Sequence, residues 1–315
     1  MASRGVLVTC LLTCIATIAI GCQTSSQSSG EVRYLIGMSQ ANLVEPWRVQ
    51  MNQEIKSESQ QYTEMKVLFE DAAQSSEKQV KDVEKLLAQG IDLLMISPNE
   101  VEALKPIVNR AAEKIPVIVL DRDDPGYNYS LYIGPDNYAI GQQAGQFVVS
   151  LLGKQGGNVI EIQGFSDSPP AVGRSKGFQE VLAEHDNIHI VDTIIADWMR
   201  DRAEDKVKEV ITRYPKVDVI FAHNDAMAQG ASIAAAKLRI QGIQFVGIDG
   251  LSGANGGIQL VRMGVLTGTF NYPTGGKVAV QYAMKLLDHE KGLPRRVTLS
   301  SERITRSNFQ DGSTP

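Results

Sequence analysis

One local pattern recurs along this chain of 315 residues and restricts what it can fold into. In Val219 to Ala231 (VIFAHNDAMAQGA) an unbroken apolar run ends in Asn224 and Asp225 and leads directly into a helix of small residues. Unbroken apolar runs are typical of strands that are covered on both faces, as in parallel sheets. The same plan returns at 93–97, 117–122, 159–164 and 245–250. The repetition predicts an α/β fold.

The remaining segments form two similar series. In the first we expect strands at 34–38, 65–70, 91–97, 116–122 and 131–134, with helices at 47–61, 77–89 and 101–114. In the second we expect strands at 159–164, 188–196 and 245–249 and one that begins at Val219 and ends in the Asn224-Asp225 pair. We expect helices at 139–152, 172–184 and 201–213 and one that directly follows this pair. A strand at 265–271, a helix at 274–291 and a strand at 296–300 follow. Two doubly wound parallel-sheet lobes, joined by a multi-strand hinge, are the simplest interpretation.

The first residues differ from the rest of the chain. After Arg4 a run without charge extends from Val6 to Gly21 and ends at Cys22, which predicts a secretory leader over residues 1–22. Its end, Ala19-Ile20-Gly21-Cys22, resembles the lipobox of bacterial lipoproteins, and this resemblance implies lipid attachment at Cys22. Ordinary secretion and an uncleaved anchor are the alternatives. Residues 23–30 are predicted to be a Ser-rich tether.

Composition excludes some classes of protein. The net charge of −5 provides no basic surface for a phosphate backbone, so we expect no nucleic-acid partner. All three cysteines, Cys10, Cys14 and Cys22, lie in or at the edge of the leader. The folded part would then contain no disulfide and would depend on core burial, for which 43% apolar residues suffice.

Polar and aromatic side chains gather at the expected carboxyl ends of the strands, the edge at which parallel sheets bind ligands. A sugar needs hydrogen-bond acceptors and forked donors around one molecule, and an indole face can pack on its C–H surface. We therefore predict a sugar site made of Trp47, Arg48, Asp121, Arg122, Arg174, Trp198, Asn224 and Asp249.

Each of these residues also has a purely structural interpretation. The tryptophans could belong to the core, and Asp121 with Arg122 could form a local ion pair. In the Asn224-Asp225 pair we assign Asp225 to the helix N-cap and Asn224 to the ligand. Asp249 could simply belong to a turn.

Signals for catalysis are weak. His223 adjoins Asn224, and a supporting hydrogen bond explains it better than a general base. The Gly-rich segments 153–157 and 253–257 lack the Lys-Ser/Thr of a phosphate loop, and we expect turns there. No cluster has metal-ligand spacing. We predict no catalytic residue, metal or cofactor.

From Tyr34 to about Thr298 the chain resembles the type I periplasmic sugar-binding proteins, the ribose-binding-like importer receptors, and within them the galactofuranose-binding branch. The motifs that carry the resemblance are GMSQ (37–40), WR (47–48), MN (51–52), LDR (120–122), EIQG (161–164), AVGRSKGF (171–178), FAHNDAMAQGA (221–231) and GIDG (247–250).

The resemblance implies a sugar held between the lobes by the eight residues named above, with Trp198 stacking on it. Ribose binders have an aromatic residue in place of Arg48 and an arginine in place of Val172, which argues against ribose. The Asn271-Tyr272 pair and the loop 166–170 also differ, so the sugar stays open. The implied lobes are 31–134 plus 272–302 and 135–271 plus 303–315, with crossings near 135–137, 271–274 and 298–303.

We therefore expect an exported, lipid-anchored, monomeric receptor that captures a monosaccharide and delivers it to the membrane permease of an ABC importer. A sugar sensor that passes its closed form to a sensor kinase or chemoreceptor is the main alternative. A repressor core of the same fold is disfavoured by the leader. A glycosidase would need two carboxylates that flank the glycosidic bond it cleaves. Asp121 and Asp249 are the candidates for this pair.

Anchoring can be tested at Cys22. If lipid is attached there, Cys22→Ser should release the protein into the soluble fraction or block its processing, because the substituted side chain has no thiol to be acylated. Membrane fractionation of cells expressing the full chain measures this. An unchanged membrane fraction would contradict lipidation.

Overall fold

The computed structural model describes residues 1–2 and 32–309. The predicted lipidation site Cys22 and the tether over 23–30 lie outside the described residues. The described part contains two six-stranded sheets, each covered by helices. None of the helices formed by these residues has the length and apolarity needed to cross a membrane.

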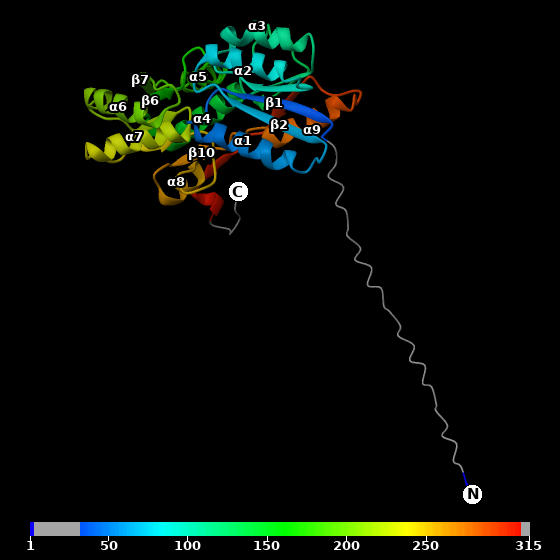
Figure 1. Ribbon diagram of the computed structural model, residues 1–315. Helices are drawn as coiled ribbons and strands as arrows, with labels where there is room; N and C mark the ends of the chain where they lie inside the picture. The colour runs from blue at the N-terminus through cyan, green and yellow to red at the C-terminus, as the bar shows by residue number, and fades with distance from the viewer. Residues whose placement is uncertain (3–31, 310–315) are drawn as a thin grey trace. The chain divides into compact units, whose positions relative to one another are not determined.

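The first sheet has the strand order β11-β5-β4-β3-β1-β2, and all of its pairs are parallel. Its strands are β1 (Tyr34–Gln40), β2 (Met65–Asp71), β3 (Leu93–Ser97), β4 (Val117–Leu120), β5 (Leu131–Pro135) and β11 (Arg296–Leu299). The helices are α1 (Pro46–Ser59), α2 (Ser76–Ala88), α3 (Val101–Ala112) and α9 (Gly276–Leu287). Figure 1 shows α2 and α3 on one face and α1 and α9 on the other. We call this sheet and its helices the first lobe.

The second sheet has the order β12-β10-β9-β8-β6-β7, in which only the β10–β12 pair is antiparallel. Its strands are β6 (Gly157–Gln163), β7 (Ile188–Ile195), β8 (Val219–Ala222), β9 (Gln244–Val246), β10 (Gly268–Phe270) and β12 (Arg303–Thr305). The helices are α4 (Asn137–Leu152), α5 (Pro169–Leu182), α6 (Arg200–Val210), α7 (Asp225–Lys237) and α8 (Gly257–Met263), with short 3-10 turns at Gly153–Gln155, Ile211–Arg213 and Arg306–Phe309. We call this sheet and its helices the second lobe.

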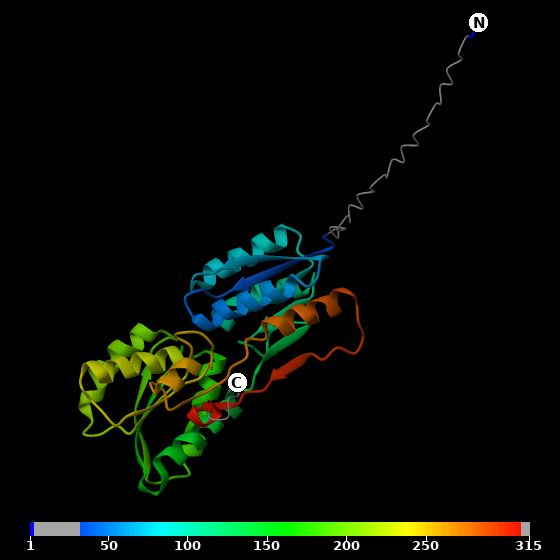
Figure 2. The same cartoon turned by 90° about the horizontal axis from the view of Figure 1, so that it is seen from below.

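The chain passes between the lobes after β5, after β10 and after β11. Figure 2 shows the orange and red segments making the later passages. The largest buried apolar cluster contains side chains of both lobes and of the passages, including Ile133, Ile140 and Tyr272. The predicted fold class, two doubly wound parallel-sheet lobes, is confirmed.

Two short elements were not predicted. We expected only a turn near 253–257, but α8 begins at Gly257 and buries Leu260 and Val261. The edge strand β12 was expected only as part of a crossing, and it has three residues. Elements this short carry too few residues to establish a hydrophobic period, so tertiary packing decides them.

The start of α7 corrects one prediction. Asn224 is the N-cap, because its side-chain oxygen accepts the Met227 N–H at 2.8 Å. The buried Asp225 instead accepts the Gly250 N–H at 2.8 Å and the Thr269 hydroxyl at 2.6 Å. These bonds tie α7 to the segments that follow β9 and form β10. Burial raises the pKa of Asp225 to about 6, even though both bonds oppose the rise.

This raised pKa predicts a pH-dependent contribution to stability. The folded state keeps a proton on Asp225 that the unfolded chain releases above its ordinary pKa of 3.8. Ionisation with rising pH therefore lowers the free energy of unfolding. Asp225→Asn keeps the shape and removes the charge, since the amide can accept from Gly250 and donate to Thr269.

We compare the free energy of unfolding of Asp225→Asn with that of the wild type at each pH. We expect the difference, variant minus wild type, to increase by about 3 kcal/mol between about pH 4 and about pH 7. Urea unfolding at each pH measures it, and titrating groups that do not interact with Asp225 cancel in the comparison. A difference that does not vary with pH would show that the carboxylate is not desolvated as described.

Candidate ligand-binding site

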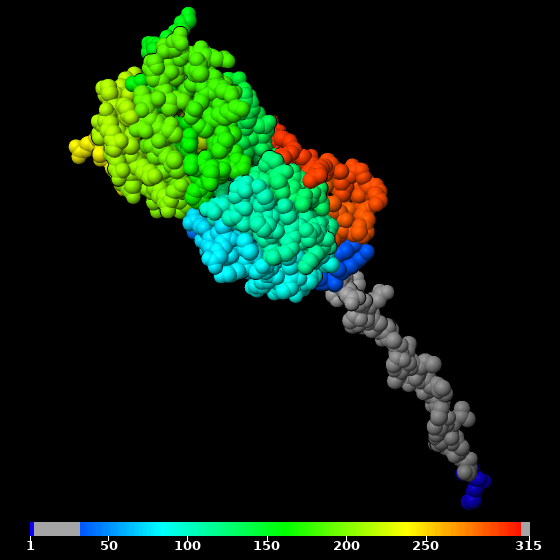
Figure 3. Space-filling view, turned by 90° about the horizontal axis from the view of Figure 1, so that it is seen from above, coloured from blue at the N-terminus to red at the C-terminus, as the bar shows by residue number. Residues whose placement is uncertain are grey.

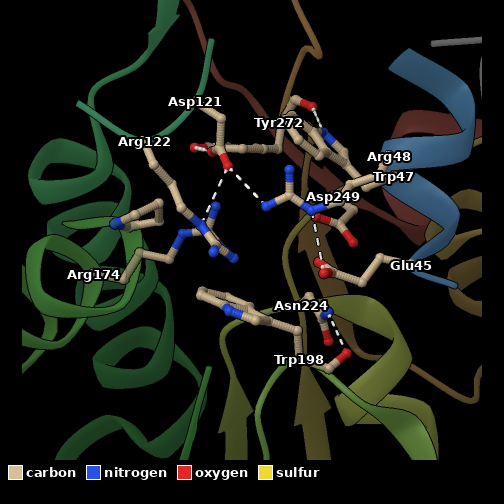
Figure 4. Close-up of a pocket in the computed structure, with 11 residues that line it drawn as sticks. Glu45, Trp47, Arg48, Asp121, Arg122, Arg174, Trp198, Asn224, Asp249 and Tyr272 are labelled. Atoms are coloured by element: carbon tan, nitrogen blue, oxygen red, sulfur yellow. Dashed lines mark hydrogen bonds and ion pairs between the residues drawn. The ribbon is translucent and has the colours of Figure 1, made fainter. Parts of the chain in front are cut away.

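The carboxyl ends of strands from both sheets meet around a small cavity. The structure brings all eight predicted site residues to its wall, together with three that were not predicted (Figure 4). The first lobe contributes Glu45, Trp47, Arg48, Asp121 and Arg122; the second lobe contributes Pro170, Arg174, Trp198, Asn224 and Asp249; Tyr272 lies on the passage between β10 and α9.

Arg48 is held rigidly within the first lobe. Its guanidinium donates to Gln40 Oε1 at 2.9 Å and Ser97 Oγ at 2.6 Å, and it pairs with Glu45 at 3.2 Å and Asp121 at 3.4 Å. Burial alone would lower the pKa of Arg48, but the carboxylates of Glu45 and Asp121 raise it above its ordinary value. Arg48 therefore presents a fixed positive charge to the cavity.

Arg122 is a second buried cation, 2% exposed. It donates to the carbonyl oxygen of Asn99 and lies 3.7 Å from the carboxylate of Asp121. Burial, and then the nearby Arg48, lowers the pKa of Arg122 to about 10, so the group is still charged at neutral pH. The local Asp121–Arg122 pair considered from the sequence does form, and both side chains also line the cavity.

The second lobe supplies Arg174, whose Nε donates to Asn137 Oδ1 at 2.9 Å and whose Nη1 donates to the carbonyl oxygen of His223. The guanidinium lies 4.3 Å from the centroid of the Tyr272 ring and 5.6 Å from that of Trp198. At these distances the cation interacts favourably with both aromatic faces.

Both tryptophans are buried, as the core interpretation expects, and both also line the cavity. Trp47 donates its Nε1–H to the carbonyl oxygen of Tyr272 at 2.7 Å. Trp198 packs directly on Gly164, where an added Cβ would lie 2.0 Å from the indole. Only glycine allows the indole to lie this close to the end of β6.

Asn224 and Asp249 differ in whether their side chains already form hydrogen bonds within the protein. The Asn224 side chain caps α7 and donates to the carbonyl oxygen of Trp198 at 3.0 Å, so it is largely occupied. Within residues 32–309, the Asp249 carboxylate forms no hydrogen bond or ion pair in this structure. Burial, and then the Asp225 carboxylate, raises the pKa of Asp249 well above its ordinary value.

Tyr272 is the most informative of the residues that were not predicted. Its hydroxyl donates to Asp121 Oδ1 at 2.8 Å and accepts from Asn137 Nδ2 at 3.1 Å. The pair Asn271-Tyr272 had been noted only as a departure from the related proteins. The sequence feature that could have identified Tyr272 as a cavity residue is its position in a predicted crossing between the lobes, next to the expected cleft.

His223 supports the wall from behind and is not among the residues that line the cavity. Its Nε2 lies 2.9 Å from Glu161 Oε1, and both side chains are fully buried. Burial lowers the pKa of His223 although Glu161 opposes this, which favours a neutral imidazole that donates to the carboxylate. This geometry matches the supporting hydrogen bond that we preferred from the sequence.

The cavity wall carries charges of both signs, because three guanidinium groups lie beside the carboxyl groups of Glu45, Asp121 and Asp249. In the described part of the chain no three His, Cys, Asp or Glu residues are grouped to hold a metal ion. A neutral ligand with many donors and acceptors suits such a wall better than an ion, since it adds no uncompensated charge.

Comparisons with known proteins agree with this geometry. The family model of the periplasmic binding protein domain matches residues 36–291. The ribose import binding protein of Bacillus subtilis (strain 168) is 31% identical over 226 residues, 71% of this chain and 72% of that protein. The galactofuranose-binding protein of Escherichia coli (strain K12) is 29% identical over 251 residues, 75% of each chain.

A solved structure, the fructose-binding periplasmic domain of a hybrid two-component system, matches with a TM-score of 0.83 and 38% identity over 87% of this chain and 91% of that one. These similarities confirm the resemblance seen in the sequence. The chain belongs to the periplasmic binding protein family.

Proposed function

We propose that the protein is an extracytoplasmic receptor that captures a monosaccharide between its lobes and delivers it to an ABC importer. One observation carries this proposal: cations, carboxylates and indoles from both lobes converge on one enclosed cavity. Neither lobe alone has a complete site, so a ligand that fills the cavity favours the closed arrangement.

The proposed ligand contacts follow from the wall. Arg48, Arg122 and Arg174 would donate to sugar oxygens, Asp121, Asn224 and Asp249 would accept from hydroxyls, and Trp47 and Trp198 would pack on C–H faces. Binding without chemical change is proposed, as in the binding proteins to which the chain is similar. Fructose, ribose and galactofuranose, named for three relatives, are the first sugars to test.

A signalling output is the second candidate, because the 38% identical solved structure is the periplasmic domain of a two-component system. The cavity would serve either role, since both use the closed form. Transport of labelled sugar by cells that lack this protein distinguishes them: uptake falls if it feeds an importer and is unchanged if it only reports to a sensor.

We further propose that the protein is exported as a monomer and anchored by lipid at Cys22. The charge-free leader and its lipobox-like end support the anchor. The proposed lobe boundaries are those implied by the resemblance, 31–134 plus 272–302 and 135–271 plus 303–315.

Two site variants should behave differently. Asp249→Asn replaces a carboxyl group that has no internal hydrogen bond, so we expect about tenfold weaker sugar binding with an unchanged or higher melting temperature without sugar. Arg48→Met leaves Glu45 and Asp121 buried without their cation, and should cost about 3 to 5 kcal/mol of stability besides weakening binding.

Calorimetric titration of the sugar found in a thermal-shift screen measures affinity, and thermal unfolding measures stability. The control is Asp201→Asn, an aspartate whose side chain is 78% exposed, which should change neither. Unchanged sugar affinity in Asp249→Asn would remove this residue from the proposed site. No stabilisation by any sugar in the screen would contradict the function itself.

Closure can be measured directly. Arg48, Arg174 and Trp198 come from different lobes and are all 5% exposed or less, so the lobes must separate for a ligand to enter. We expect saturating sugar to decrease the radius of gyration in small-angle scattering, since only the closed form completes the site. An unchanged radius would show that the lobes do not act as a clamp.

A further inference from the structure

A second depression adjoins the cavity. It lies between segments 99–103 and 122–125 of the first lobe and Phe165, residues 167–169 and Val172 of the second. We call it the side groove. Figure 3 shows a face on which cyan and teal residues of the first lobe meet green residues of the second. Arg122 lines both the side groove and the cavity, so the groove and the cavity share this residue in their walls.

Three polar atoms of residues that line the side groove form no hydrogen bond within the described part of the chain, although one of them, Arg122 Nε, lies 3.7 Å from the Asp121 carboxylate. Among the described residues, Asn99 Oδ1, Arg122 Nε and Asp123 Oδ1 are buried without a hydrogen bond, although Asn99 and Arg122 are only 4% and 2% exposed. The amide of Asn99 is oriented by its Nδ2, which donates to Gln74 O at 3.2 Å and Ser76 Oγ at 3.0 Å. Its oxygen is therefore a free acceptor.

Buried polar groups are nearly always bonded, because leaving one without a partner costs about 1 to 3 kcal/mol. The residues that carry these atoms line the same groove, and the Arg122 guanidinium lies 5.7 Å from the centroid of the Phe165 ring. Sugar hydroxyls donate and accept, and an aromatic face packs on sugar C–H groups. The side groove therefore has the same kinds of side chain as the cavity, namely a guanidinium, polar acceptors and an aromatic ring, but fewer of them.

We propose that the side groove is a subsite for a second sugar unit, so that the receptor accepts disaccharides or glycosides with one unit in the cavity and the next in the groove. This inference rests on the proposed sugar-binding function. The carboxylates of Glu100, Glu102, Asp124 and Asp167 also line the groove and disfavour an anionic group such as a phosphate or sugar acid. The second unit is therefore a neutral sugar.

The test compares ligand lengths. The full chain is titrated with D-fructose, D-galactose and D-ribose, and with disaccharides that carry each of these units at either end. We expect at least one disaccharide to bind as tightly as its single unit or more tightly. Single sugars that bind while every disaccharide fails would overturn the subsite and leave the proposed function intact. No binding of either length would overturn both.

Two variants separate the groove from the cavity. Val172→Trp adds bulk to the groove from a side chain that is 50% exposed, and should weaken the disaccharide at least tenfold while leaving the single sugar unchanged. Leu238→Trp, at a position 40% exposed and outside the groove, is the matched control and should change neither.

Asn99→Ala, which removes the free acceptor, should weaken the disaccharide about tenfold and leave the single sugar unchanged. If Val172→Trp and Asn99→Ala weaken single and double sugars equally, the groove is not a separate subsite.

Discussion

The site depends on the carboxylate of Asp121. One of its oxygens accepts the Tyr272 hydroxyl, and the other lies 3.4 Å from Arg48 and 3.7 Å from Arg122. Tyr272 in turn accepts from Asn137, and Asn137 accepts from Arg174 of the second lobe. A continuous set of polar contacts therefore joins the first lobe to the second through two of the passages between them.

Burying these charged groups without a ligand costs free energy. Three guanidinium groups and three carboxyl groups lie in a small cavity, and ion pairing offsets only part of their desolvation. The Asp249 carboxyl has no internal partner, and its raised pKa reflects this cost. Under the proposed function a sugar would supply the missing hydrogen bonds, so the free energy of closure would be coupled to occupancy without any change in the lobes themselves.

The same reasoning explains why the side groove matters. Charged and polar groups inside the cavity mostly have protein partners, whereas Asn99 and Asp123 each present a buried oxygen without one. Both residues follow strands of the first lobe, next to Arg122. A ligand that extends from the cavity past Arg122 would reach the groove that these residues line, and the neighbouring carboxylates would disfavour an anionic group on it.

The amino-acid sequence by itself determined the alternation of strands and helices, because buried parallel strands leave long apolar runs that can be read locally. It also predicted which eight residues meet at the cavity wall, since the carboxyl ends of parallel strands share one edge. Tertiary structure alone decided which residue caps α7, because whether Asp225 or Asn224 turns inward depends on Gly250 and Thr269, far along the chain. It likewise decided the position of Tyr272 and the lining of the side groove, because their contacts join segments that no local pattern brings together.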